Sequence, residues 1–220
     1  LKGHIGDNPQ DLVISLYSDA DFAGDKESSK STSGIFIALT GPNTFYPLNA
    51  TSRKQTCVSH STPEAEIVAA NAAIRTEGLP ALQLWEKVLG KSVDLIVLED
   101  NTATMQVLKT GKNPTMRHLN RTHRVILSWL SEVFRTCDQV HIAYCNTNEQ
   151  AADLLTKGFT NPVVWERVRS LIGIVPLKDK SNSYGTNTTK DQVDPGTLRS
   201  YTIGNDKACP KEQARVKAAS

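Results

Sequence analysis

Three apolar, β-favouring runs follow one another early in the chain, and their order constrains the fold more than any other feature. Residues 12–18 and 34–40 have the composition of strands, and a third, weaker strand covers residues 44–51. A turn signal, Gly41-Pro42-Asn43, separates the second run from the third. Because strands joined by short connections pair antiparallel, the sequence predicts an antiparallel meander.

From Ser61 onward the hydrophobic period becomes helical. Ser61-Thr62-Pro63-Glu64 has the signals of a helix start, a hydroxyl N-cap followed by proline, and the helix is predicted to run to a glycine stop at Gly78. Helical spacing resumes before Gly90, and apolar strands follow at 93–98 and 139–144. Further helices are predicted over 126–134, around Asp153 and over 164–171.

Composition limits the partners that the chain can have. No run approaches the roughly 20 apolar residues that cross a bilayer, which excludes a membrane protein. Residues 1–176 hold 17 basic and 18 acidic residues, a net charge of −1, so nucleic acid is expected only if the basic residues gather on one face. Residues 177–220 hold eight basic and five acidic residues without sustained periodicity, and we expect a mostly disordered tail.

Four acids occupy the ends of predicted elements. Asp19 ends the first strand, Asp100 ends the fourth strand, Glu66 lies early in the long helix and Asp153 lies early in a later helix. Carboxylates on separate elements suit Mg²⁺, which prefers hard oxygen ligands and keeps several waters. The chemistry that needs such a group is phosphodiester hydrolysis with two metal ions about 4 Å apart.

Each acid also has an ordinary structural interpretation. Asp19 fits a turn, Asp100 fits an N-cap and Asp153 fits a solvated helix face. Glu66 is more informative, because its apolar neighbours place it inside the protein, where an unpaired charge is costly. Glu64 is interpreted as a first-turn acid that suits the helix dipole. Spacing alone leaves these alternatives open.

Other catalytic constellations fail on their spacing. Ser59-His60-Ser61 lacks the G-x-S-x-G context of a hydrolase triad, and the chain has no P-loop. His118 and His123 are five residues apart and do not share a helix face as zinc ligands would. The four cysteines form no C-x-x-C pair, which favours free thiols in a reducing compartment.

Six short motifs occur in order along the chain. They are YSDADFAGD (17–25), KSTSG (30–34), SRKQ (52–55), HSTPEAE (60–66), EDN (99–101) and NEQAADLLTK (148–157). The sequence closely resembles the ribonuclease H domain at the C-terminal end of copia-type retrotransposon Pol polyproteins, where the pattern is similar to DADWAGD, KSTSG, SKKQ, SSTEAE, CDN and EQLADILTK. The resemblance runs from about Leu1 to Val175, and Leu1-Lys2-Gly3 is similar to the LKG that closes the preceding reverse transcriptase.

The resemblance implies an α/β, ribonuclease H-like fold: a five-stranded mixed sheet whose first three strands are antiparallel, with helices on both faces. It divides the chain into a connection to an upstream reverse transcriptase (1–11), a ribonuclease H-like domain (12–176) and the tail (177–220). The implied activity is endonucleolytic hydrolysis of the RNA strand of RNA/DNA hybrids during reverse transcription. The implied location is a cytoplasmic retrotransposon particle or the nucleus.

The resemblance assigns the four acids to two Mg²⁺ ions, with Mn²⁺ as a substitute. Asp19 would bridge both ions, Glu66 and Asp100 would hold one, and Asp153 would help to hold the other. Glu66, rather than Glu64, occupies the position of the helical glutamate in the family pattern. One ion would generate the attacking hydroxide, and the second would stabilise the departing 3′-oxygen.

The resemblance also suggests where the hybrid is bound. Contacts to ribose 2′-hydroxyls in the minor groove would distinguish RNA from DNA. The candidate contacts lie near predicted turns and would form the basic face required above, whereas solvated surface residues are the alternative interpretation for each of them. They are Lys30, Ser31, Thr32, Arg53, Lys54, Gln55, Arg117, His118 and Arg121.

The sequence departs from the family pattern at three places. Glu99 replaces the usual cysteine before Asp100, and it would add negative charge beside the metal site if it points inward. His118-Leu119-Asn120 replaces HID, and Cys145-Asn146-Thr147 replaces a valine-proline-threonine. None of these departures removes a predicted metal ligand.

Three other functions compete with an active ribonuclease H. The first is a non-catalytic, domesticated or decaying remnant that keeps the fold and binds nucleic acid. The second is another metal-dependent nuclease or an integrase on the same architecture. The third is a plain interaction module, which predicts no clustering of the four acids.

Overall fold

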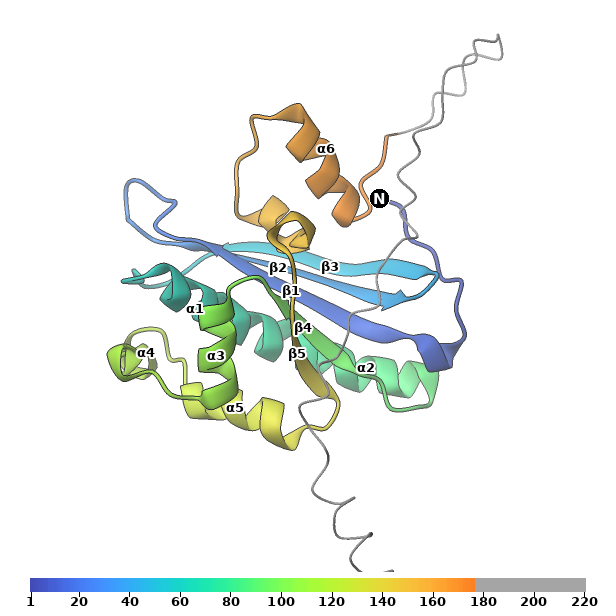
Figure 1. Cartoon of the computed structure of the whole chain (residues 1–220), viewed down its shortest axis with the longest axis horizontal. Helices are drawn as coiled ribbons and strands as arrows, with labels where there is room; N and C mark the ends of the chain where they lie inside the picture. Colours follow the sequence, from blue (N-terminus) through green and yellow to red (C-terminus); the bar gives the residue numbers. More distant parts are fainter. Residues whose placement is uncertain (177–220) are drawn as a thin grey trace, which may run out of the picture.

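A computed structural model of the chain describes residues 1–176 and contains one five-stranded mixed sheet (Figure 1). The strands are β1 (Val13–Asp21), β2 (Thr32–Gly41), β3 (Thr44–Lys54), β4 (Leu95–Glu99) and β5 (Val140–Tyr144). They lie in the order β3-β2-β1-β4-β5; β1, β2 and β3 pair antiparallel, whereas β4 and β5 run parallel to β1. The predicted fold class is confirmed. The predicted tail at 177–220 lies outside the described residues.

The first three strands form the predicted meander. β1 and β2 pair without interruption from Val13↔Thr40 to Asp21↔Thr32, so β1 extends past its apolar run and carries Asp19 inside the sheet. The pairing of β2 with β3 shifts register at Ile37/Ala38, close to Pro47. A proline is tolerated there because β3 is the edge strand and one of its sides needs no backbone partner.

Helices connect and cover these strands. Within residues 1–176 the α-helices are α1 (Thr62–Ala73), α2 (Leu79–Leu89), α3 (Thr102–Thr110), α4 (Leu119–Thr122), α5 (Leu127–Thr136) and α6 (Pro162–Leu171). The sequence pattern did not predict α3, and Asp153 lies on a 3₁₀ helix (Ala151–Leu155) rather than on an α-helix. None of the helices in the described part of the chain combines the length and apolarity needed to cross a membrane.

The predicted helix stop at Gly78 is wrong. α1 continues through a π-helical segment (Ile74–Gly78) directly into α2, and Gly78 has right-handed helical angles, φ −63° and ψ −58°. A Cβ at this position would lie 2.9 Å from the Leu16 side chain and 3.0 Å from the Leu95 side chain. The glycine therefore permits close packing of the helix on the sheet and does not end the helix.

Both faces of the sheet are covered. Figure 1 shows α1, α2, α3 and α5 on one side and α6 on the other. Side chains alternate along the central strands: Leu16 and Val97 pack into the core on the first side, whereas Tyr17 and Leu98 pack into the core on the second. This two-sided burial explains the continuous apolar sequence of β4 and fixes its end beside the end of β1.

Candidate active site

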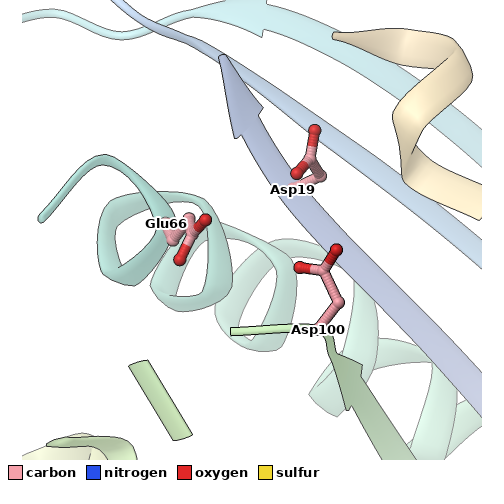
Figure 2. A group of neighbouring side chains, drawn as sticks. All are labelled: Asp19, Glu66 and Asp100. Atoms are coloured by element: carbon pink, nitrogen blue, oxygen red, sulfur yellow. The ribbon is translucent and has the colours of Figure 1, made fainter. Parts of the chain in front are cut away.

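Three predicted metal ligands meet at the carboxyl-terminal edge of the two central parallel strands. Asp19 lies near the end of β1, and Asp100 directly follows β4. Because the register pairs Tyr17 with Leu98, two residues before each acid, the acids lie at equivalent positions. α1 brings Glu66 against them (Figure 2). One carboxylate oxygen of each acid lies within 4.8 Å of those of the other two.

The carboxylate of Glu66 is held inside the protein against the other two acids. Its side chain is 6% exposed, and Thr104 on α3 donates a hydrogen bond of 2.8 Å to its Oε2. Burial, reinforced by the negative charges of Asp100 and Asp19, raises the pKa of Glu66 to about 7. A cation bound at this place would reverse the shift, because it would stabilise the ionised form.

The chemistry of these donors suits magnesium. All three are carboxylates, the hard oxygen ligands that Mg²⁺ prefers. Asp19 and Glu66 are buried, whereas Asp100 is half-buried and leaves the group accessible to solvent. Among residues 1–176, this is the only group of three or more His, Cys, Asp or Glu ligand atoms that lie this close together.

Asp153 lies beside this group but is bound to a lysine. It is 7% exposed on the 3₁₀ helix Ala151–Leu155, and Lys157 Nζ lies 2.6 Å from its Oδ1. The same ammonium lies 3.5 Å from Asp19 Oδ1. Burial raises the pKa of Asp153 to about 6, with a contribution from Asp19 and Asp100 and with opposition from Lys157. Sequence reasoning missed Lys157, although its i, i+4 spacing from Asp153 is a visible signal.

Glu99 points into the protein, so the additional carboxyl group does lie beside the acids. It is 1% exposed, and the Ser18 hydroxyl and the Asn101 N–H each donate to one of its oxygens at 3.4 Å. Burial, followed by the charges of Glu66 and Asp100, raises the pKa of Glu99 well above its ordinary value. The raised pKa favours the protonated form, in which the group would add a carboxyl without adding charge.

Asn101, not Asp100, caps the following helix. The Asn101 side chain accepts hydrogen bonds from the N–H groups of Ala103 and Thr104 at 2.9 and 3.2 Å, which satisfies the start of α3. The capping alternative for Asp100 is therefore wrong. Its carboxylate faces Asp19 instead (Figure 2).

Glu64 lies in a second buried environment near the start of α1. It is 1% exposed, and its Oε1 lies 3.1 Å from His118 Nε2 and 3.4 Å from His123 Nε2. Its Oε2 accepts a hydrogen bond from the His60 N–H at 3.2 Å. Glu64 is therefore more than an acid that suits the helix dipole: it ties residues 118–123 to the first turn of α1.

The exposed candidate hybrid contacts are arginines and one lysine. Arg53 on β3 is exposed, and so are Arg117 and Arg121 near α4. Lys54 is also exposed, but it forms an ion pair of 2.5 Å with Asp25. These side chains are accessible to a nucleic-acid backbone without any rearrangement of the core.

The other candidates have structural contacts. Ser31 is buried and its Oγ accepts the Ala23 N–H at 3.1 Å. Gln55 is buried, and its Nε2 donates to the Ala65 carbonyl at 2.9 Å, which joins β3 to α1. The half-buried candidates are Lys30, Thr32 and His118. The hydrogen bonds of Ser31 and Gln55 place these two residues behind the surface rather than on it.

The chain is similar to long polyproteins of plant transposons. It is 28% identical over 167 residues to the retrovirus-related Pol polyprotein from transposon TNT 1-94 of Nicotiana tabacum, and the match covers 71% of this chain and 11% of that protein. It is 27% identical over 168 residues to the Pol polyprotein from transposon RE2 of Arabidopsis thaliana, with 76% and 11% covered. The chain thus spans about a tenth of the length of these relatives. No protein-family model matches it.

Two solved structures have similar folds at low sequence identity. LC11-RNase H1, isolated from compost by a metagenomic approach, has a TM-score of 0.45 and 15% identity, and the match covers 66% of this chain and 92% of that one. The N-terminal RNase H domain of Rv2228c from Mycobacterium tuberculosis has a TM-score of 0.42 and 12% identity, with 72% and 98% covered.

The sequence matches and the strand order agree with the resemblance found in the short motifs. The relatives are the Pol polyproteins that the motifs indicated, and the sheet has the mixed topology that the resemblance implied. This chain therefore has the five-stranded mixed sheet that the resemblance implied, and it is similar in sequence to the retrovirus-related Pol polyproteins of plant transposons.

Proposed function

We propose that this chain is a metal-dependent endoribonuclease that hydrolyses the RNA strand of RNA/DNA hybrids during reverse transcription. The observation that carries the proposal is the convergence of Asp19, Glu66 and Asp100 within 4.8 Å from three separate elements. Burial of such a group destabilises the folded state, because each ionised carboxylate makes the ionisation of its neighbours less favourable. A site that binds a cation compensates this cost.

Mg²⁺, or Mn²⁺ in its place, would be held by Asp19, Glu66 and Asp100. When bound, two such ions supply activation of a water and stabilisation of the leaving oxygen. Asp153 would contribute to the second ion once its carboxylate leaves Lys157, which now lies 2.6 Å from it. The four acids therefore differ in whether they are already placed to bind a cation. Three face one another, whereas Asp153 is paired with the ammonium group of Lys157.

Neighbouring hydroxyl groups orient the two buried acids. Thr104 donates to Glu66 Oε2, and Thr156 donates to Asp19 Oδ2. These bonds restrict the rotamers of the carboxylates before any cation or substrate arrives. Lys157, between Asp153 and Asp19, places a positive charge where the phosphate of a substrate would approach.

The proposed substrate is consistent with the exposed arginines of the chain. Arg53, Arg117 and Arg121 are exposed and would contact phosphates, which supply most of the affinity for a nucleic acid. Recognition of ribose 2′-hydroxyls would select the RNA strand. We further propose that an upstream reverse transcriptase domain delivers the hybrid, in a retrotransposon particle in the cytoplasm or in the nucleus.

A non-catalytic remnant that only binds nucleic acid is the second candidate. The contact of Lys157 with both Asp153 and Asp19 favours it, because an ammonium in this position occupies the place of a second cation. The inward carboxyl group of Glu99 also distinguishes this chain from the family pattern. This candidate predicts hybrid binding without cleavage.

The experiment that separates the two is a cleavage assay on a labelled RNA/DNA hybrid with Mg²⁺. The wild-type chain and Asp100→Asn are compared on the hybrid, on double-stranded DNA and on single-stranded RNA. We expect cleavage of the RNA strand of the hybrid by the wild type and not by the variant. Binding without cleavage by the wild type would support the remnant, and equal cleavage by both chains would overturn the assignment of Asp100.

A further inference from the structure

A pocket opens on the helical layer, away from the three carboxylates. It has a volume of about 330 Å³ and is lined by Asn71, Arg75, Arg124, Ile126 and Trp129. This volume is at the small end of the roughly 300–1,000 Å³ of ligand pockets. None of the lining residues belongs to the candidate active site. Arg75 follows Glu66 by nine residues, or about 13 Å along the same helical run.

One wall of the pocket is a stacked pair of side chains. The guanidinium carbon of Arg75 lies 5.8 Å from the ring centroid of Trp129, over the face of the indole. Arg75 belongs to the π-helical segment Ile74–Gly78, and π-helical turns inside α-helices frequently mark functional sites. A planar guanidinium supported by an indole is a surface on which a base can stack.

Another lining residue, Arg124, has an unusual backbone conformation. Arg124 has a φ of +57°, a left-handed conformation that residues other than glycine rarely adopt. The flanking chain enforces it, because the N–H groups of His123 and Val125 both donate to the Leu119 carbonyl, at 2.9 and 3.2 Å. Val125 is buried, so the turn is anchored and the Arg124 side chain stays exposed. Strained residues of this kind cluster at ligand sites.

Three of the five lining residues, Arg124, Ile126 and Trp129, belong to a segment of one-sided charge. Residues 101–131 contain no Asp or Glu and five Lys or Arg. Neither Arg75 nor Arg124 forms an ion pair with any described residue, in contrast to Lys157 and Lys54. Arg124 continues the exposed series that begins with the predicted hybrid contacts in the same segment. The positive charge is therefore available to an anionic partner.

We propose that this pocket binds one nucleotide of a single-stranded nucleic acid, with its phosphate on Arg124 and its base on the Arg75–Trp129 pair. A single strand is the ligand that fits, because its unpaired bases can turn onto an aromatic or guanidinium face while the backbone contacts basic residues. The inference rests on the nucleic-acid binding of the proposed function. The pocket would provide an additional contact for a single strand that extends from the hybrid.

The test is binding of a fluorescein-labelled 12-mer RNA by the full 220-residue chain, measured by anisotropy in EDTA between 50 and 200 mM salt. The test variant is Arg75→Gln/Arg124→Gln, and the matched control is Arg135→Gln/Arg167→Gln, which removes the same charge from exposed positions outside the pocket. We expect Kd to rise about tenfold in the test variant only. The slope of log K against log salt should fall by about 0.7, the value for one single-strand phosphate contact.

A second measurement locates the base. A 4-thiouridine in the same RNA should crosslink on irradiation to the peptide that contains Trp129, and this crosslink should weaken in the test variant. Equal Kd and equal salt slope in the test and control variants would overturn the proposal. The two arginines and the indole would then belong to a partner of another class, such as an acidic protein segment.

The outcome is independent of catalysis. If the wild type fails to cleave the hybrid but the test variant still loses affinity for RNA, the proposed activity is wrong and the pocket assignment stands. If the wild type cleaves the hybrid and the test variant binds RNA as the control does, the activity stands and the pocket assignment is wrong.

Discussion

Glu64 and Glu66 lie two residues apart on α1 and are both buried, but the side chains around them differ in chemistry. Glu66 faces Asp19 and Asp100, and burial among these acids raises its pKa to about 7. Glu64 faces the imidazoles of His118 and His123. Residues two apart on an α-helix point about 200° apart, so one helix presents its two acids to two different sides of the protein.

The difference lies in the groups that contact each carboxyl. The carboxyl group of Glu64 has its polar neighbours within the chain: the His60 N–H donates to it, and the imidazoles of His118 and His123 lie 3.1 and 3.4 Å away. The carboxylate of Glu66 accepts a hydroxyl from Thr104 but has acids as its charged neighbours. We infer that the environment of Glu64 stabilises the fold and that the environment of Glu66 binds a cation. The same helix then joins the segment that carries Arg117 and Arg121 to the metal ligands.

The largest expected effect is the loss of hybrid cleavage in the Glu66→Gln variant. Removal of this charge should lower the single-turnover rate on an RNA/DNA hybrid by at least about 10²–10³-fold, because the amide cannot replace an anionic ligand. Glu132→Gln is the matched control, since it makes the same change at an exposed position on α5. A cleavage rate for Glu66→Gln close to that of the control would contradict the inference that the environment of Glu66, unlike that of Glu64, binds a cation.

The second effect is on stability without divalent cations. Glu66 has a pKa of about 7 against an ordinary 4.5, and Asp153 has a pKa of about 6 against 3.8, so the folded state holds more protons than the unfolded state between these values. The free energy of unfolding should therefore fall as pH rises from 5 to 8, by about 3 kcal/mol for Glu66. Urea unfolding in EDTA at several pH values measures this slope.

Two controls accompany that slope. Glu66→Gln should flatten it, because the amide does not titrate, and saturating Mg²⁺ should flatten it in the wild type, because a cation favours the ionised carboxylates. A slope that neither change reduces would show that other groups are responsible.

A smaller loss is expected for Glu64→Ala. His118 and His123 would lose their buried partner, which should lower the free energy of unfolding by about 1–3 kcal/mol and raise KM for the hybrid more than it lowers kcat. Asp94→Ala is the control, since Asp94 lies 3.3 Å from His141 but is a half-exposed acid, and its loss should cost less than about 1 kcal/mol. Loss of Mg²⁺ affinity in Glu64→Ala would contradict the separation of the two environments.

The smallest effect is expected for Glu99→Gln. Burial raises the pKa of Glu99 and so favours the protonated form, whose shape and charge an amide reproduces. We therefore expect the cleavage rate and the Mg²⁺ affinity at pH 7 to change by no more than about twofold. Parallel rate and binding measurements check this. A large gain in Mg²⁺ affinity would mean that Glu99 is ionised in the wild type and competes with the metal ligands.

Local sequence was sufficient for much of the sheet and for three acids. Apolar runs predicted the meander. The parallel pairing of β1 with β4 brings Asp19, near the end of β1, and Asp100, directly after β4, to one edge. Glu66 was distinguished from Glu64 by its apolar neighbours. That argument selected the right residue for the acidic group, but Glu64 is equally buried, because histidines more than fifty residues away cover it.

The missed features depend wholly or partly on contacts between residues that lie far apart in the sequence. Glycine often ends a helix, yet the chain stays helical at Gly78, where Leu16 and Leu95 pack closely against it. The environment of Asp153 depends on Lys157, which lies one helical turn later and reaches back to Asp19 as well. In each case a side chain from another strand or turn decides the role of a residue whose own neighbours suggest a different one.

The most direct test of the metal site is a Mn²⁺ titration followed by electron paramagnetic resonance. Asp19→Asn, Glu66→Gln and Asp100→Asn should each weaken Mn²⁺ binding by at least about tenfold relative to the wild type, because each removes one carboxylate ligand. Glu64→Gln should bind Mn²⁺ as the wild type does. Equal affinity in all five proteins, or loss of affinity in Glu64→Gln alone, would contradict a metal site built from Asp19, Glu66 and Asp100.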